Sequence, residues 1–434
     1  MRILFYNPAP TPRRFVPFEA IKGSAFFRRP NYDAMRLAYL SKGHDFFYYD
    51  ERIEEQPNFM PDIVIVNVSL TLSRYIESTI RKKWKNKCKI ICYGFYSTLF
   101  PERNKKFSDT VVIGDIANVW QNIVSDIKNN ALAKLYISNR QDQFPIDRTI
   151  ESKYGFTPIL SQLRTSFGCT CPKEQKDFCY ENILYKEFVQ WDVNSVVEEI
   201  SRMKRKIIFI RDDDFLYDLD YAIKVLEKSW RYKKMWIFQT TGDFFDHFHI
   251  LPSLREDGVR IIYLKENWLN KDLINKMNNR EYTKEKKYQV GLIHNNRIAV
   301  GGKLRLGYEG EDYVSYRKLL KFLIDIRLDF IQVTVQTPMP KTNTYEQYLK
   351  SGLIVEDLTL FDQWMPVVQA PSIDPQVLYS WMEWLRDRFY SWDSIFLRSV
   401  HISAHLGLYN TIFFYLVPNL SYRNNFLERV GYPP

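Results

Sequence analysis

The first third of the chain alternates short apolar runs with amphipathic segments. Apolar runs at 2–7, 45–49, 62–68, 87–93 and 110–113 predict strands, and segments with helical spacing at 32–42, 72–85 and 118–127 predict helices. Strands that alternate with helices form parallel sheets covered on both faces. This part of the chain therefore predicts a Rossmann-like, doubly wound α/β domain over residues 1–135.

Polar residues stand where several of these predicted strands end. The strand ends are Asn7-Pro8, Asp50, Ser69-Leu70 and Tyr93-Gly94. Ligands of doubly wound sheets bind at the carboxyl ends of the strands. We therefore expect any ligand of the first domain to lie along this edge.

The alternation resumes after a polar, irregular stretch at 130–157, which we interpret as a linker. Strands are predicted at 159–163, 207–210, 235–239, 259–264, 297–306 and 330–335, with helices between them at 194–203, 219–231 and 313–326. Six βα units are enough for a partial (β/α)6 barrel over residues 150–345. The remaining residues, 346–434, are rich in aromatic residues and predict a helical C-terminal extension.

Composition places the chain among ordinary globular proteins. It has 434 residues, 45% of them hydrophobic and 26% charged, which suits two or three domains with a core each. No apolar run is long enough to span a membrane, and the N-terminus lacks the features of a signal peptide. Five cysteines do not suggest a disulfide framework, so we expect a reducing, cytoplasmic location.

The net charge of +10 raises the question of a nucleic-acid partner. Lysines and arginines are scattered, however, and usually have acidic residues near them, as at 284–287, which is typical of solvated helix faces. We therefore expect no nucleic-acid partner. The aromatic fraction of 16% favours a bulky apolar substrate, such as a small molecule, lipid or peptide, or peripheral contact with a membrane.

Three of the five cysteines lie in one short loop after the predicted strand 159–163. These are Cys169, Cys171 and Cys179. Several thiolates on one loop are what an iron–sulfur cluster requires, because one loop can then wrap the metal. Buried or redox-active thiols are the alternative. Cys88 and Cys92 occupy one face of a predicted strand and are interpreted as core residues.

The residues around this loop resemble the cobalamin-binding-domain type of radical S-adenosylmethionine (radical SAM) enzyme. Thr165-Ser166-Phe167-Gly168-Cys169 is similar to the family's Ser-Arg-Gly-Cys, and Phe178-Cys179 to its Phe-Cys. The family spacing is Cys-x3-Cys-x2-Cys, whereas this loop has Cys-x-Cys-x7-Cys. Lys173 and Lys176 stand where a middle cysteine would be expected.

Later segments resemble the same family in the same order. Ile208–Phe215 is similar to its Asp-Asp-Asn-Phe strand end, Tyr263–Asn267 to its Gly-x-Glu-Ser, Gly307–Asp312 to its Gly-x-x-Gly-x-Asp, and Thr337–Tyr345 to its Thr-Pro-x-Pro-Gly-Thr-x-x-Tyr with Lys341 for glycine. The resemblance covers nearly the whole chain. It implies that Cys169, Cys171 and Cys179 hold a [4Fe–4S] cluster and that Asp212, Asp213, Gln239 and Glu266 bind SAM; it identifies no catalytic residue.

The first domain resembles the cobalamin-binding half of these enzymes. Gly43-His44-Asp45 is similar to its Gly-His-x-Val, and Tyr93–Thr98 to its Gly-Gly-x-His-x-Thr. The resemblance implies cobalamin contacts from Ser69, Tyr93 and Gly94. There is no Asp-x-His-x-x-Gly, so a histidine-ligated cobalt is not expected, and Tyr93, Phe95 and Tyr96 are bulkier than the family residues.

The resemblance implies reductive cleavage of SAM to a 5′-deoxyadenosyl radical, which abstracts a substrate hydrogen before methylation of an unactivated carbon from methylcobalamin. The electron would come from a donor such as flavodoxin or ferredoxin. Two alternatives stay open: a radical SAM cyclisation or rearrangement without cobalamin, which the bulky Tyr93–Tyr96 loop favours, and a non-catalytic binding protein, which the cysteine spacing favours.

Overall fold

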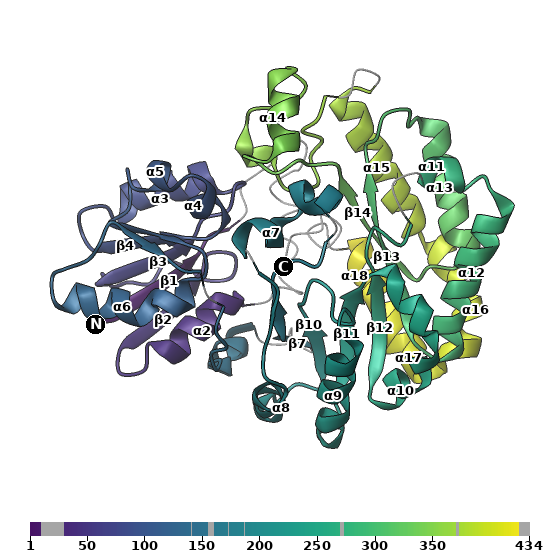
Figure 1. Ribbon diagram of the computed structural model, residues 1–434, viewed down its shortest axis with the longest axis horizontal. Helices are drawn as coiled ribbons and strands as arrows, with labels where there is room; N and C mark the ends of the chain where they lie inside the picture. Colours follow the sequence, from purple (N-terminus) through teal and green to yellow (C-terminus); the bar gives the residue numbers. More distant parts are fainter. Residues whose placement is uncertain are drawn as a thin grey trace.

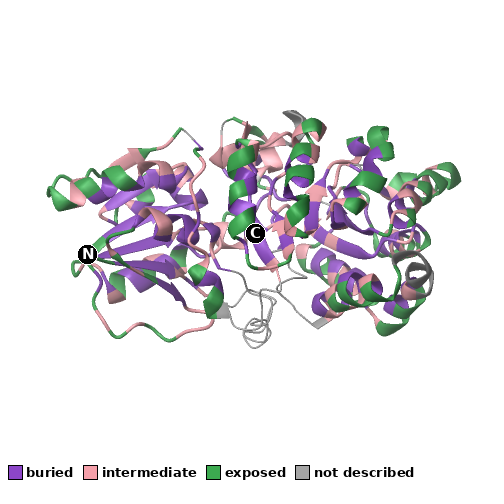
Figure 2. Cartoon of the chain, turned by 90° about the horizontal axis from the view of Figure 1, so that it is seen from below, coloured by how far each residue is buried: buried purple, intermediate pink, exposed green. Residues whose placement is uncertain are grey.

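The computed structural model describes residues 1–9, 30–139, 141–154, 160–171, 173–185, 187–269, 273–369 and 373–424. Two parallel sheets stand side by side, each covered by helices, and the cysteine loop with α7 (Tyr180–Leu184) lies between them (Figure 1). Buried residues concentrate on the strands of both sheets, whereas exposed residues concentrate on the helices (Figure 2). The predicted α/β class with two parallel sheets is confirmed.

The first sheet has the strand order of a doubly wound fold. Its strands are β1 (Arg2–Asn7), β2 (Asp45–Asp50), β3 (Ile63–Asn67), β4 (Lys89–Tyr93), β5 (Thr110–Ile113) and β6 (Leu135–Ile137), in the order β2-β1-β3-β4-β5-β6 and all parallel. One face packs on α2 (Tyr32–Leu40) and α6 (Ile116–Lys128), the other on α3 (Ser73–Lys83) and α4 (Phe95–Leu99), which α5 (Pro101–Asn104) follows.

The linker interpretation of residues 130–157 is wrong for two parts of this stretch. Residues Leu135–Ile137 form the edge strand β6, and Arg148–Tyr154 form the 3-10 helix η2. The strand has three residues, an apolar run too short to predict a strand.

The second sheet is an open half-barrel. Its strands are β7 (Leu160–Leu163), β10 (Ile207–Ile210), β11 (Met235–Thr240), β12 (Val259–Leu264), β13 (Ala299–Leu306) and β14 (Phe330–Val335), which lie in sequence order and are all parallel. Residue 159 of the predicted first strand lies outside the described residues. The helices between the strands are α8 (Val193–Arg202), α9 (Leu219–Ser229), η4 (Trp230–Tyr232), η5 (Gly242–Ile250), α10 (Leu251–Glu256), α11 (Leu273–Lys276), α12 (Arg280–Asn295) and α13 (Tyr313–Asp325).

Alternate residues of these strands face the lumen of the half-barrel. Gln239, Tyr263, Gly301 and Phe330 are neighbours in register on β11 to β14 and share that face. A Cβ at Gly301 would stand 2.4 Å from the Tyr263 ring, so glycine is required for the ring to lie across the strand. Outward residues such as Ile262 and Val300 are fully buried under the helices.

The C-terminal extension packs against the half-barrel. After α14 (Asn343–Lys350) and η6 (Leu358–Leu360) it forms α15 (Pro375–Phe389), α16 (Trp392–Leu406), α17 (Leu408–Thr411), the π-helix η7 (Ile412–Leu416) and α18 (Val417–Asn424). The Tyr422 hydroxyl lies 3.1 Å from that of Tyr263 and accepts a hydrogen bond from Gln332, while its ring stacks on Tyr390. The extension therefore fills part of the lumen beside β12 and β14.

Within the described residues, no helix combines the length and the apolar character needed to cross a membrane.

Candidate metal centre

A short antiparallel ribbon holds the cysteine loop. β8 (Ser166–Phe167) pairs with β9 (Val189–Gln190), and the loop between them carries η3 (Lys173–Phe178) and α7. Gly168 begins the loop with φ +91°, and a Cβ there would stand 2.2 Å from the Glu187 carbonyl oxygen. Glycine is therefore required for the chain to turn into Cys169.

The loop brings all three predicted cysteines to one point. The Sγ atoms of Cys169, Cys171 and Cys179 lie within 4.8 Å of one another, and those of Cys169 and Cys179 are 3.0 Å apart. The backbone N–H of Cys171 also donates to the Cys169 sulfur, at 3.1 Å. Three free, half-buried thiols on one loop fit the donor set of an iron–sulfur cluster.

The three thiols cannot all be ionised without a cation. Hydrogen bonds from Cys169 and Cys179 hold the pKa of Cys171 well below its usual value, with a further contribution from the nearby Lys265 ammonium. Hydrogen bonding to Cys171 raises the pKa of Cys169, and hydrogen bonding to Cys169 raises that of Cys179. Metal ions would replace the protons that the other two thiols retain.

Asp177 connects the cysteine loop by hydrogen bonds to the segment Thr337–Tyr345. Its carboxylate accepts hydrogen bonds from the backbone N–H of Thr344 at 2.9 Å and from the Thr344 hydroxyl at 2.7 Å. Its carbonyl oxygen accepts from Met339 N–H, also at 2.9 Å. Two segments that are far apart in sequence thus fix the position of Cys179.

Asp177→Ala is expected to lower the free energy of unfolding by about 1.5–3 kcal/mol, the range for hydrogen bonds to a charged group. It should also speed the loss of iron to a chelator, because the loop loses its anchor. Chemical denaturation and chelator kinetics measure the two effects. The exposed Asp246 gives the control variant Asp246→Ala, and iron retention equal in the two variants would contradict the anchoring role.

The predicted SAM residues divide into two groups. Asp213, Gln239 and Glu266 lie at the mouth of the lumen beside the cysteines, with an Asp213 carboxylate oxygen 4.0 Å from the Cys171 sulfur. The Gln239 amide donates to the carbonyl oxygens of Asp212 and Asp213, at 3.0 Å each. The side chain of Asp212 is buried instead, and its carboxylate accepts from the N–H and hydroxyl of Thr165. Its SAM-binding role stays a prediction.

Three cations at this mouth were not predicted. Lys265 pairs with Asp213 at 2.8 Å and Arg305 with Glu266 at 2.5 Å, while the Lys303 ammonium donates to the Gln239 side-chain oxygen. Burial would raise the pKa of Glu266, but Arg305, Lys265 and Lys303 lower it to about 2. The sequence does contain a signal for two of them. Lys303 and Arg305 alternate with leucines along β13, and this alternation puts both cations on the same face of the strand, the one toward the lumen.

The predicted cobalamin residues have contacts within the first domain. The Tyr93 hydroxyl donates to Asp33 at 3.2 Å, and a Cβ at Gly94 would stand 2.1 Å from the Asn67 side-chain oxygen. The Ser69 hydroxyl accepts from Leu72 N–H at 3.3 Å. Their predicted role toward cobalamin is neither supported nor contradicted by these contacts and stays a prediction.

The edge that follows Gly94 is largely apolar. Phe95 and Tyr96 are buried in a cluster that includes Met339 and Tyr345, so this part of α4 packs against the second half of the chain. The Ser97 hydroxyl is fully buried and has no hydrogen-bond partner among the described residues. One polar group at this edge is thus left for a ligand or a water molecule, which fits a cofactor-binding edge.

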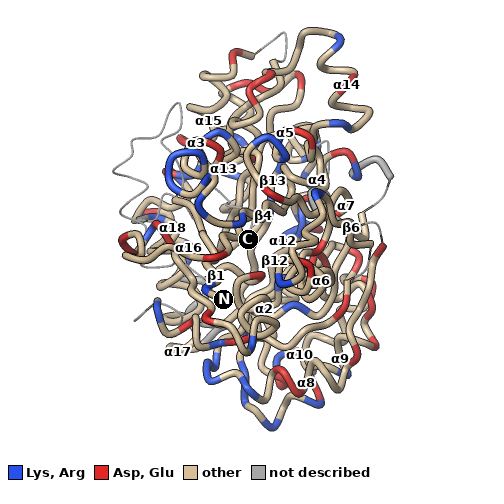
Figure 3. Tube along the Cα trace, turned by 90° about the vertical axis from the view of Figure 1, so that its left-hand side faces the viewer, with Lys and Arg blue, Asp and Glu red and all other residues tan. Residues whose placement is uncertain are grey.

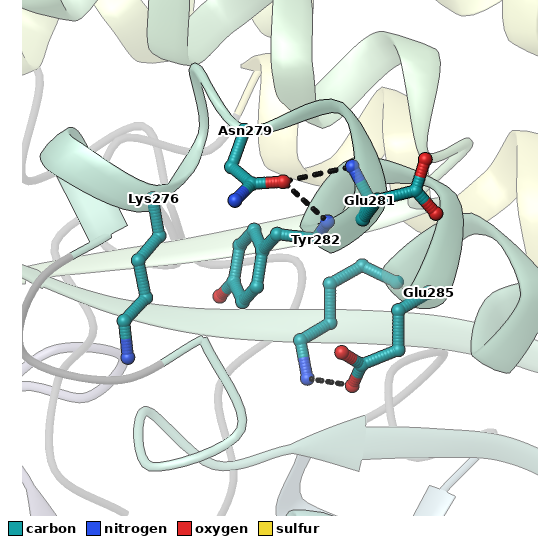
Figure 4. Close-up of a pocket in the computed structure, with 6 residues that line it drawn as sticks. Lys276, Asn279, Glu281, Tyr282 and Glu285 are labelled. Carbon is teal, nitrogen blue, oxygen red and sulfur yellow. Dashed lines mark hydrogen bonds and ion pairs between the residues drawn. The ribbon is translucent and has the colours of Figure 1, made fainter.

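A surface recess on α12 has an ordinary structural explanation. Asn279 caps the helix by accepting from the N–H groups of Glu281 and Tyr282, and Lys286 pairs with Glu285 at 3.1 Å (Figure 4). Basic and acidic residues are also interspersed along the chain in the view of Figure 3. The charges of the recess therefore belong to helix capping and surface pairing.

Comparison with known proteins gives relatives by sequence. No family model matches the chain. It is 23% identical over 330 residues, 71% of each chain, to the bacteriochlorophyllide d C-12(1)-methyltransferase of Chlorobaculum tepidum. It is 21% identical over 404 residues to the C-8(2)-methyltransferase of the same organism, covering 82% of this chain and 84% of that one.

Solved structures with the same fold are also known. The radical SAM methyltransferase TsrM from Kitasatospora setae, with cobalamin and a [4Fe–4S] cluster bound, aligns with a TM-score of 0.58 at 13% identity over 82% of this chain and 78% of that one. The cobalamin-dependent SAM radical enzyme OxsB aligns at 0.55 with 12% identity, over 89% of this chain and 61% of that one.

Proposed function

We propose, for a chain that has the fold of cobalamin-dependent radical SAM enzymes, that it is a radical SAM methyltransferase acting on an unactivated carbon. The observation that carries this proposal is the meeting of three cysteine sulfurs at the mouth of a half-barrel lumen, where the Cys171 sulfur lies 4.0 Å from a carboxylate oxygen of Asp213. When bound, the cluster and cobalamin would supply one-electron cleavage of SAM and methyl delivery. A low-potential donor such as flavodoxin or ferredoxin has to supply the electron.

The side chains at the mouth have separate tasks in this proposal. Cys169, Cys171 and Cys179 hold the cluster, and the carboxylates of Asp213 and Glu266 attract the ammonium of the SAM methionyl group. Gln239 orients the strand end through its two hydrogen bonds to the Asp212 and Asp213 carbonyls. The Asp212 carboxylate supports this turn by accepting from Thr165, and its contact with SAM stays a prediction.

The two sheets support the proposed division of the chain into three parts. Residues 1–135 form the cobalamin-binding domain with Ser69, Tyr93 and Gly94 at its edge, residues 150–345 the radical SAM barrel, and residues 346–434 the extension, whose last ten residues lie outside the described part. The substrate is a small organic molecule, and the names of the two curated relatives point to a tetrapyrrole. A reducing cytoplasm suits thiols 3.0 Å apart, which oxidation would join.

Anaerobic reconstitution with iron, sulfide and cobalamin tests the function. The expected results are about four irons per chain, bound corrinoid, and SAM cleavage to 5′-deoxyadenosine or S-adenosylhomocysteine that depends on a reductant. Cluster and cleavage without corrinoid would instead favour radical SAM chemistry without methyl transfer. A protein that binds neither iron nor SAM would overturn the proposal and leave the non-catalytic alternative.

Peripheral membrane contact is proposed for the C-terminal extension. Its exposed apolar side chains include Phe396 and Leu408, with 72% and 78% of their surface accessible, and Phe413. Arg260 lies near Tyr409 on this side and hydrogen-bonds only to carbonyl groups in the described structure. Aromatic and basic side chains together favour an anionic lipid surface.

Phe396→Asp and Phe413→Asp are each expected to weaken sedimentation of the full chain with phosphatidylserine-containing vesicles by about tenfold or more, because burial of an aromatic side chain contributes roughly 1.5–3 kcal/mol. Trp230, also exposed but on η4, gives the control Trp230→Asp. Equal sedimentation of all three variants and the unaltered protein would exclude this contact surface.

A further inference from the structure

Arg211 directly follows strand β10, where the half-barrel meets the first domain. Residues two apart on a strand share a face, so Arg211 continues the face of β10 that carries Phe209. Its guanidinium carbon lies 5.6 Å from the centre of the ring of Tyr32, the first residue of α2. A cation of the half-barrel thus lies against a helix of the first domain.

The Arg211 side chain has no anionic partner within the described residues. Its Nε atom is buried and makes no hydrogen bond there. The carboxylates around it contact other groups: Asp33 and Asp115 pair with Arg36, Glu151 and Glu199 with Arg148, Glu181 with Arg164 and Asp213 with Lys265, while Asp212 accepts from Thr165 and Asp214 from Thr240.

The surroundings of Arg211 are unfavourable for its charge. Burial lowers the pKa of Arg211 to about 10, and the Arg164 guanidinium acts in the same direction, whereas Asp33 and Glu181 oppose this effect. Burial of a cation is costly unless an anion lies beside it. Since no carboxylate of the described chain pairs with Arg211, a ligand is the remaining source of an anion.

The Tyr32 hydroxyl is a second unpartnered polar group at the same place. Tyr32 is only 5% exposed, and its hydroxyl makes no hydrogen bond to the described residues. Burial raises the pKa of Tyr32 to about 12, so the hydroxyl stays protonated and can donate. Buried polar groups without a partner are rare in native structures. Two neighbouring donors that both lack an acceptor therefore indicate a ligand that supplies one.

Arg211 lies within reach of a molecule bound beside the proposed metal centre. Asp213 follows it by two residues, a length of chain that spans at most about 7 Å. The Asp213 carboxylate in turn lies 4.0 Å from the Cys171 sulfur. One organic molecule of moderate size can therefore lie next to the cysteine loop and contact Arg211.

We propose that Arg211 and Tyr32 bind a carboxylate side chain of the substrate where the first domain meets the half-barrel. The presence of a substrate at this place rests on the proposed function, in which methyl transfer takes place between the two domains. The guanidinium can donate two parallel N–H bonds to one carboxylate, and the Tyr32 hydroxyl can add a third. The substrate class is then a tetrapyrrole with a free carboxylic acid rather than its ester.

Pheophorbide a and its methyl ester test this proposal, because they differ only in whether one carboxylate is free. Dissociation constants are measured by fluorescence titration of the anaerobically reconstituted full chain with SAM bound. The unaltered protein should bind the acid about 10- to 100-fold more tightly than the ester. Arg211→Met should remove most of this preference, and Tyr32→Phe should reduce it by about two- to tenfold.

Two further variants separate ligand binding from structural effects. Arg317→Met, at an exposed arginine of α13, controls for the loss of one positive charge and should keep the full preference. Arg211→Lys keeps the charge without the two parallel donors and should keep part of it. The denaturation midpoint of Arg211→Met should not fall, because the substitution removes a buried charge that has no partner. A lower midpoint with an unchanged preference would assign Arg211 a structural role and overturn the proposal.

The remaining outcomes distinguish this proposal from the proposed function. Failure of the unaltered protein to bind a cluster or SAM overturns the proposed function. A protein that binds both, but binds neither chlorin, binds acid and ester equally, or keeps its preference in Arg211→Met, overturns the role of Arg211 and Tyr32 alone. Weaker binding of SAM or cobalamin to Arg211→Met, with the acid preference unchanged, would assign the guanidinium to a cofactor and also overturn it.

Discussion

Cys179→Ala is expected to reduce the iron content of the reconstituted protein from about four per chain to near zero. Cys179 is the sulfur that closes the loop, since it returns through η3 to lie 3.0 Å from Cys169. Two remaining thiols cannot hold a cluster that leaves one iron open for SAM. Iron and sulfide analysis with EPR of the reduced protein measures the loss, and Cys169→Ala and Cys171→Ala should behave alike.

Cys88→Ala is the matched control. Cys88 is a free, half-buried cysteine in the loop before β4, and its sulfur contacts the Trp84 carbonyl oxygen rather than another thiol. The variant should retain its full iron content. An unchanged iron content in Cys171→Ala would mean that the ligand set differs from the three sulfurs gathered here.

The largest effect on stability is expected from Arg36→Met. Arg36 is fully buried on α2 and forms a bidentate ion pair with Asp115, at 3.0 and 2.7 Å, while Asp115 also caps α6 by accepting from Ala117 N–H. Removing the guanidinium leaves the Asp115 carboxylate buried without its cation. We expect a loss of about 3–5 kcal/mol in the free energy of unfolding, measured by urea denaturation.

An exposed arginine gives the comparison. Arg74 pairs with Asp357 at 3.4 Å and 75% of its side chain is accessible, so Arg74→Met should change the free energy of unfolding by less than about 1 kcal/mol. Equal effects of the two substitutions would show that the Arg36 pair does not stabilise the packing of α2 on α6.

Much of the architecture could be predicted because apolar periodicity sets it. The strands Ile207–Ile210, Val259–Leu264 and Phe330–Val335 have the bounds that their apolar runs indicate, and the order of the strands follows from the alternation with helices. Strand β6 was missed because three residues are too few to show a strand pattern.

The site could be predicted only in part. The cysteine spacing left open whether Cys171 joins the other two sulfurs, because this depends on η3 filling the extra residues of the loop. Asp212 and Asp213 both follow the same strand. The Asp212 carboxylate accepts a hydrogen bond from Thr165, whereas the Asp213 carboxylate faces the cysteines. Such differences depend on tertiary contacts that no local pattern records.

Lys341 illustrates how a departure from the family is accommodated. It stands where the resembled segment has glycine, and its φ of +65° is a left-handed conformation that glycine adopts without strain. Its ammonium donates to the Leu99 carbonyl oxygen and lies 4.9 Å from the Phe100 ring centroid. The unfavourable backbone conformation is thus offset by a contact that holds the first domain against the second.

The contacts of Tyr422 inside the lumen also bear on the order of events in the proposed catalytic cycle. Because Tyr422 of α18 contacts Tyr263 and Gln332 in the lumen, we expect reactants to enter and leave past the cysteine loop, at the carboxyl ends of the strands. If SAM binds beside this loop, as proposed, it has to arrive before the substrate. We therefore expect a sequential, ordered kinetic mechanism in which the methylated product leaves before the spent cosubstrate.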